Sequence, residues 1–145
     1  MSTTDAIGPP LAGRPAQALE LLGEALSEGD LDGAVALYEP DATLGLAEGA
    51  RGPGTVEVRA LLAQVMGLRL PVRVRVRGEM AGPDLALVLA VREVEGRAGD
   101  GRAVMLTGDG GAVVRRGPDH VWRLAVDDWR LPAPPASSPS ATRGR

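Results

Sequence analysis

Apolar positions in the first half of the chain recur every three to four residues, the period of a helix with one buried face. Residues 15–28 begin with Pro, carry three leucines on one stripe and are followed by Gly, which predicts a first helix. Asp30 restarts the pattern as an N-cap and Pro40 ends it, so a short second helix is expected between them. Residues 55–66 place four apolar side chains on one face, which predicts a third helix with Thr55 as its N-cap.

From residue 72 the period changes to two, which is typical of strands with one buried and one exposed face. Valines alternate with arginines over residues 72–77, and the continuously apolar run 85–91 predicts a more central strand. Two more strands are expected at 103–116 and 121–129, joined by a turn with a Pro-Asp centre, and a brief strand at 42–46 precedes the third helix. The pattern predicts an α+β fold with three N-terminal helices packed on a curved antiparallel sheet.

Length and composition favour a single soluble domain. A chain of 145 residues is enough for one hydrophobic core. Ends rich in Pro, Ser, Ala and Gly predict a flexible tail at 1–14 and a disordered tail at 132–145 around a folded domain at 15–131. The absence of Cys excludes a disulfide, a thiolate metal site and a cysteine nucleophile. No stretch approaches the ~20 apolar residues of a membrane span, and no targeting segment precedes the domain, so we expect a cytoplasmic protein without a membrane partner.

Charge narrows the possible partners and cofactors. A net charge of -3 argues against nucleic acid, which favours a basic face. The basic stripe of Arg73, Arg75 and Arg77 has no interleaved aromatic residue, so a solvated face or a dimer contact is the better interpretation. The single histidine, His120, falls in a predicted turn, which excludes a serine-type triad and a His-rich metal site. We therefore expect no metal and no cofactor.

Three segments carry a family resemblance: GDLDGAVALYEPDAT at 29–43, RGPGTVEVRALL at 51–62 and AVVRRGPDHVWRLAVDDW at 112–129. They resemble the second helix, the third helix and the last hairpin of the nuclear-transport-factor-2-like superfamily, in its uncharacterised SnoaL-like branch. The superfamily includes ketosteroid isomerase and the SnoaL-like polyketide cyclases. The resemblance implies a cystatin-like cone with an internal pocket and a homodimer formed through the outer face of the sheet. It implies little about function, because this fold carries isomerases, cyclases, dehydratases, hydrolases and non-catalytic subunits.

The residues that ketosteroid isomerase uses are not retained. Matching the two patterns places Leu46 at the catalytic base, Leu22 at the oxyanion-hole Tyr and Gly111 at the neutral Asp. None of these three side chains can transfer or donate a proton. We conclude that the chain is not a ketosteroid isomerase, and we expect the two leucines to line an apolar pocket.

The last predicted strand offers another acid/base pair. Its even positions, from Trp122 to Asp128, are apolar until the end, so the even face is expected inward with Asp128 on the buried side. If Gly117 faces His120 across the turn, Asp109 lies opposite Asp128 on that face. Two opposed carboxylates repel, so one of them would hold its proton near neutral pH, as a general acid or base does. We expect Asp128 to be the catalytic base or acid and Asp109 its catalytic partner.

This pair has structural alternatives. Glycines surround Asp109 in the stretch 108–111, and a bulge there would break the register and turn the carboxylate to water. Asp128 could instead form an ion pair with Arg130 at the end of the sheet.

Other side chains are candidates for a substrate pocket. Tyr38 is either a pocket donor or a core residue of the second helix with its hydroxyl satisfied. Arg59 either reaches the pocket or stays exposed or salt-bridged, and Trp122 either forms the cavity floor or packs in the core. Thr107 and Arg130 are expected to bind substrate oxygens near the mouth. The full predicted pocket consists of Leu22, Tyr38, Leu46, Arg59, Thr107, Trp122, Val126 and Arg130.

Two functions follow from these candidates. The first is a cofactor-independent isomerase, cyclase or dehydratase that acts by carboxylate acid/base catalysis on a small apolar oxygenated molecule, such as a polyketide-like or terpenoid compound. The second is a non-catalytic module that binds a ligand or forms a dimer. The missing isomerase residues favour the second function, whereas a buried Asp128 would favour the first.

Overall fold

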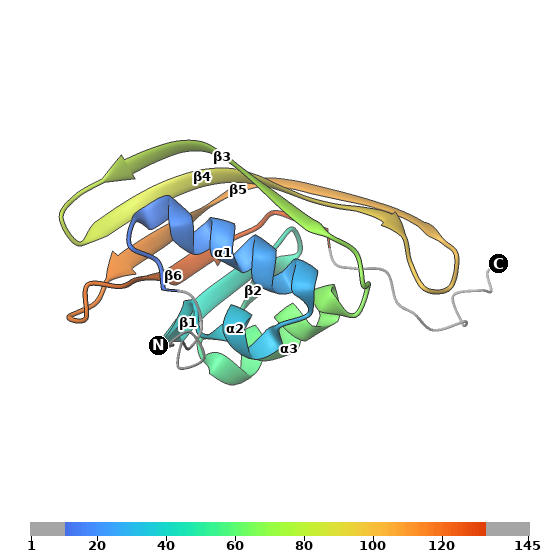
Figure 1. Ribbon diagram of the computed structural model, residues 1–145, viewed down its shortest axis with the longest axis horizontal. Helices are drawn as coiled ribbons and strands as arrows, with labels where there is room; N and C mark the ends of the chain where they lie inside the picture. The colour runs from blue at the N-terminus through green and yellow to red at the C-terminus, as the bar shows by residue number, and fades with distance from the viewer. Residues whose placement is uncertain (1–10, 133–145) are drawn as a thin grey trace, which may run out of the picture.

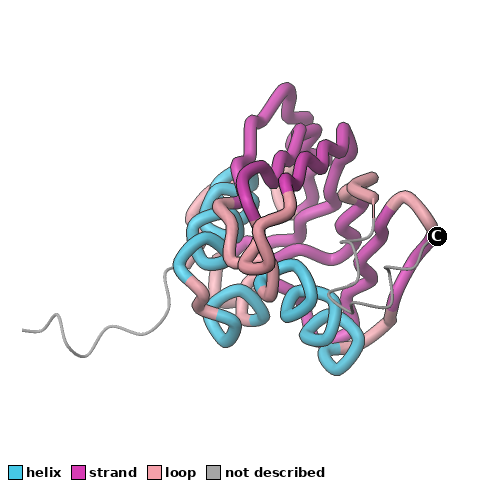
Figure 2. The backbone as a smooth tube through the Cα atoms, turned by 90° about the vertical axis from the view of Figure 1, so that its right-hand side faces the viewer, coloured by secondary structure: helices cyan, strands magenta, loops and turns pink. Residues whose placement is uncertain are grey.

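The computed structural model describes residues 11–132; within the predicted tails, residues 1–10 and 133–145 lie outside this range. Its elements are α1 (Pro15–Glu28), α2 (Leu31–Val35), β1 (Tyr38–Leu46), β2 (Gly49–Arg51), α3 (Thr55–Met66), β3 (Val72–Ala81), β4 (Leu85–Arg97), β5 (Ala103–Arg116) and β6 (Trp122–Asp128). The six strands form one sheet in the order β2-β1-β6-β5-β4-β3, and the helices lie against one side of its curl (Figures 1 and 2). None of the described helices is long and apolar enough to cross a membrane.

Two of the three predicted helices are confirmed with their bounds. Helix α1 buries the three leucines of the predicted stripe and ends at Gly29, whose φ of 76° is a conformation that glycine adopts without strain. Helix α3 is capped by the backbone of Gly54, so the prediction that Thr55 is the N-cap was wrong. The second helix is shorter than predicted, because the chain beyond Val35 joins the sheet: the Leu37 carbonyl accepts a hydrogen bond from the backbone of β6.

The sheet is mixed, and the expectation of a wholly antiparallel sheet was wrong. Strand β1 runs parallel to β6, while the other neighbouring strands are antiparallel. Parallel pairing needs a long connection, and residues 47–121 between these two strands supply one. The connection between β1 and α3 contains the short strand β2.

A β-bulge reverses the phase of β6. Val114 pairs with Leu124, whereas the preceding residue of β5, Val113, pairs with Val126, which leaves Ala125 as the extra residue. A bulge turns every later side chain of the strand to the opposite face. Leu124 is therefore inward as predicted, but Val126 is exposed on the outer face and Asp127 is fully buried.

The glycine-rich stretch of β5 makes room for the chain that follows β6. The register of β5 against β4 is unbroken from Ala103 to Arg115, so the bulge considered at residues 108–111 is not there. A Cβ built at Gly108 or Gly110 would overlap the backbone of residues 128–131. These two positions thus let residues 129–131 lie directly against the inner face of the sheet.

The interior between the helices and the sheet is filled by side chains. The largest fully buried side chains include Trp129 and Arg92, together with leucines of α1, α3 and β1. A hollow of about 480 Å³ near the ends of α1 and α3 is an open surface groove lined by residues such as Leu26 and Met66. The predicted internal pocket therefore coincides with a packed core that contains two charged residues, Arg92 and Asp127.

Candidate functional site: a buried arginine–aspartate cluster

Four side chains, from three strands and the segment after β6, meet in the interior between the helices and the curved sheet. We call this interior the cone. Asp127 of β6 accepts a hydrogen bond at Oδ2 from the Tyr38 hydroxyl (2.6 Å) and another from Trp129 Nε1 (2.7 Å). Arg92 of β4 lies with Nη2 2.8 Å from Asp127 Oδ1, and its guanidinium carbon is 4.9 Å from the centre of the Trp129 ring. Arg92 is 1% exposed and Asp127 0%, so the ion pair is shielded from water. We refer to these four residues as the buried cluster.

Arg92 carries more hydrogen-bond donors than the described residues satisfy. Its N–H bonds are not directed at Asp127 Oδ1, so the 2.8 Å contact is a charge interaction without a directed hydrogen bond. Within residues 11–132, none of its three guanidinium nitrogens has a hydrogen-bond acceptor. A buried donor without an acceptor costs about 1–3 kcal/mol, and protein interiors seldom tolerate one without a reason.

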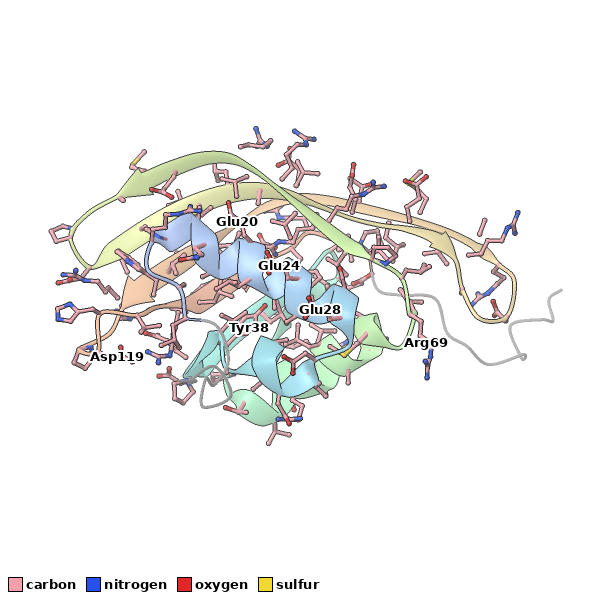
Figure 3. All side chains as sticks on the ribbon, in the orientation of Figure 1. Glu20, Glu24, Glu28, Tyr38, Arg69 and Asp119 are labelled. Atoms are coloured by element: carbon pink, nitrogen blue, oxygen red, sulfur yellow. The ribbon has the colours of Figure 1, made fainter. Side chains whose placement is uncertain are left out.

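Tyr38 keeps its proton in this environment. Burial raises the pKa of the Tyr38 hydroxyl well above its ordinary value, and the nearby negative charge of Asp127 raises it further. The hydroxyl is thus a permanent donor to Asp127. Tyr38 begins strand β1 and is buried; Figure 3 labels it just below helix α1 in that view.

The burial of Arg92 could be predicted from the sequence, whereas that of Asp127 could not. Alternate residues of β4 face the core, so the buried positions Val88 and Ala90 place residue 92 inward as well. The continuously apolar run ends at Val91, so the strand predicted from it did not include this charge. Asp127 was placed outward because a strictly alternating strand was assumed, and the bulge at Ala125 reverses that assignment.

The two carboxylates predicted to be catalytic do not meet in the structure. Asp128 pairs with Gly111, not with Asp109, so the predicted register was wrong: the bulge and the wider turn shift it by two residues. Asp109 lies opposite Val91 and forms an exposed ion pair with Arg77 (2.9 Å). Asp128 forms an ion pair with Arg130 (2.8 Å), the alternative considered from the sequence.

The remaining predicted pocket residues divide between the core and the surface. Leu22, Leu46 and Trp122 belong to the same hydrophobic core as Tyr38. Arg59 is on the surface of α3 and forms an ion pair with Asp32, while three others are exposed on or beside the sheet. Those three are Thr107, Val126 and Arg130.

No group of three or more His, Asp or Glu side chains in residues 11–132 is arranged to hold a metal ion. The chemistry that the buried cluster offers is hydrogen bonding, charge and proton transfer at one carboxylate.

The geometry agrees with solved structures of the same fold. No protein-family model matches the sequence, and no curated protein is significantly similar to it. A ketosteroid isomerase-like protein from Erwinia carotovora atroseptica SCRI1043 superposes with a TM-score of 0.67 and 16% identity, over 77% of this chain and 88% of that one. An NTF2-like protein with a cystatin-like fold from Novosphingobium aromaticivorans gives a TM-score of 0.66 and 16% identity, over 88% and 86%.

A third similar structure, from Thiobacillus denitrificans ATCC 25259, is provisionally described as a calcium/calmodulin-dependent protein kinase type II association domain. Its TM-score is 0.65 with 18% identity, over 87% of this chain and 99% of that one. These similarities establish an α+β fold. More specifically, the chain has the cystatin-like fold of NTF2-like proteins, as its sequence motifs predicted.

Proposed function

We propose that the protein binds a small, neutral, largely apolar molecule inside the cone, with an oxygen atom of the ligand accepting hydrogen bonds from Arg92. The observation that carries this proposal is a fully buried arginine whose N–H groups have no acceptor among the described residues. An otherwise apolar interior with a few convergent polar groups is the usual composition of a small-molecule site.

The charge of the cluster argues for a neutral ligand. Arg92 and Asp127 balance each other in a region closed to bulk solvent. An added carboxylate would leave an excess negative charge beside Asp127, and unpaired buried charge is strongly unfavourable. A carbonyl or hydroxyl oxygen supplies the missing acceptor without adding charge.

If the protein is an enzyme, Asp127 is the carboxylate in position to move a proton within the cone. Tyr38 would then donate a hydrogen bond to it or to the substrate, since its raised pKa keeps the hydroxyl protonated. Isomerisation, cyclisation and dehydration need only such proton transfers. The catalytic roles predicted for Asp128 and Asp109 stay predictions, and comparing Asp127→Asn with Asp128→Asn in any turnover assay separates the two assignments.

The test is a screen of neutral ketones, phenols and lactones against matched carboxylic acids, read by thermal shift and calorimetry. We expect neutral compounds to bind, and Arg92→Leu to abolish that binding. Arg59→Leu is the matched control, because Arg59 is exposed on α3. Arg92→Lys keeps the charge if the leucine variant does not fold. Binding that survives both Arg92 substitutions would exclude the buried cluster as the site.

A second candidate function is homodimerisation through the outer face of the sheet. Leu87 and Leu89 of β4 and Val126 of β6 are exposed there, with β5 between the two strands, around an open hollow of about 440 Å³. Apolar patches of this kind on a folded surface favour association. Two ion pairs border this apolar patch, Arg77 with Asp109 and Arg130 with Asp128. A rim that carries both positive and negative charges can be complementary to itself in a two-fold dimer.

The fold shared with a protein described as an association domain also supports this second candidate. Analytical ultracentrifugation tests it. We expect a dimer for the wild type and a monomer for Leu89→Asp, because a charge would be buried at the interface. Val56→Asp is the control, since Val56 is also an exposed apolar residue but lies on α3. A monomeric wild type at high micromolar concentration would reject the dimer.

A further inference from the structure

Trp129 fills a specific place in the buried cluster. Its indole ring lies over the guanidinium of Arg92, and its Nε1–H donates to Asp127 Oδ2 at 2.7 Å. The side chain is 1% exposed although it lies beyond the last strand, near the end of the described chain. A flat aromatic ring with one hydrogen-bond donor is thus already accommodated beside the buried ion pair, in contact with both charged groups.

The segment that carries Trp129 is built differently from the rest of the core. Two backbone hydrogen bonds hold this segment. The Trp129 N–H donates to the Gly45 carbonyl of β1, and the N–H of Ala47, the residue after β1, donates to the Leu131 carbonyl, each at 3.0 Å. On the β5 side it faces Gly108 and Gly110, which have no side chains to interlock with it. Leaving the sheet would break these two hydrogen bonds and expose Trp129 and Leu131, but no side chain of Gly108 or Gly110 would have to repack.

We propose, resting on the interior binding proposed above, that Trp129 holds the place of the ligand and that a neutral aromatic molecule with a phenolic hydroxyl displaces it. The aromatic ring of the ligand takes the position of the indole over Arg92. Its hydroxyl donates to Asp127 Oδ2, as the indole N–H does, and also accepts from Arg92. A phenol thus supplies the acceptor that the indole lacks, and this is the differential interaction that drives the exchange.

If the phenol competes with the Trp129 side chain for one position, its affinity should respond to substitution of Trp129 differently from the affinity of a preformed site. The apparent dissociation constant is the intrinsic one divided by the fraction of molecules with the indole displaced. Removing the indole should therefore strengthen phenol binding, whereas removing a side chain that only contacts the ligand would weaken it. We expect Trp129→Ala to bind p-cresol at least about tenfold more tightly than the wild type.

The direct measurement uses tryptophan emission. The chain has two tryptophans, so Trp122→Phe leaves Trp129 as the single reporter. Excitation at the red edge of indole absorption avoids the phenol. We expect p-cresol to cause a saturable shift of the emission to longer wavelength, as the buried indole meets water. Toluene lacks the hydroxyl and 4-methylanisole lacks the donor, so each should bind at least about tenfold more weakly than p-cresol.

The outcomes separate this inference from the proposal beneath it. Binding of p-cresol that raises the melting temperature and depends on Arg92, but leaves the Trp129 emission unchanged, overturns the displacement and keeps the interior site. If no neutral compound binds, both fail. If Trp129→Ala does not fold, Trp129→Phe replaces it: this variant keeps a ring, loses the N–H donor, and should still bind p-cresol more tightly than the wild type.

Discussion

Neighbouring aspartates of β6 provide a sharp test of the buried cluster. Asp127→Asn keeps the size and one acceptor oxygen of the side chain but removes its charge. Arg92 is then left as an unpaired cation in the core, because Asp127 is its ion-pair partner among the described residues. Removing one member of a buried ion pair costs about 3–5 kcal/mol, a large share of the roughly 5–15 kcal/mol that holds a domain folded.

Urea unfolding followed by circular dichroism measures this loss. With an m-value of about 1.7 kcal/mol/M, within the range for small proteins, the midpoint should fall by roughly 2–3 M. Asp128→Asn is the matched control. Its carboxylate forms an exposed ion pair with Arg130, and such pairs add little stability, so the midpoint should stay near that of the wild type.

Equal shifts in the two variants, or a larger shift for Asp128→Asn, would refute the phase of β6 and with it the buried cluster. The double variant Arg92→Met/Asp127→Asn gives a further check. It should recover part of the loss of Asp127→Asn, because no unpaired charge then remains in the core.

Three other predictions follow from the same structure. Gly110→Ala should lower the melting temperature by several degrees, since its Cβ would overlap the backbone after β6, whereas Gly99→Ala, with open space around it, should not. Tyr38 is the single tyrosine, and its raised pKa means that stability present below pH ~10 is lost as pH rises through the folded value; absorbance should show no phenolate in the folded protein at pH ~10. Hydrogen bonds from Arg123 lower the pKa of Asp119 to about 2, so the melting-temperature advantage over Asp119→Asn should be present above pH ~4 and vanish as pH falls toward 2.

The helices and most strands could be predicted because their signals are local. The leucine stripe of 15–28 and the valine–arginine alternation of 72–77 each state a period within a few turns or pleats. The second helix was extended too far for a non-local reason. The backbone from Leu37 onward forms hydrogen bonds with β6, some ninety residues later in the chain. The sequence around Tyr38 contains no local pattern that indicates this pairing.

The prediction of the site failed because the bulge in β6 adds one residue and so exchanges the inward and outward positions after it. Leu124, Ala125 and Val126 are all apolar, so nothing in the sequence marks which of them is the extra residue of the bulge. Strict alternation along the strand therefore predicted that Asp128, and not Asp127, is the buried aspartate. Arg92 was within reach of the same reasoning, since the alternation of β4 continues past Val91. The glycines near Asp109 were recognised as unusual, but their partner, the segment after β6, can be identified only in three dimensions.

The position of β6 has a consequence for how the chain acquires its fold. The last of the described strands to be synthesised, β6, lies between β1 and β5, so it joins a β2-β1 hairpin to the β5-β4-β3 meander (Figure 1). Until residues 122–128 leave the ribosome, each half presents an unpaired strand edge, and contacts across the full length of the domain are still missing. Such long-range closure slows folding, and exposed edges invite pairing with other chains. For this sheet, the interval between synthesis of β5 and docking of β6 is the period of greatest exposure to aggregation.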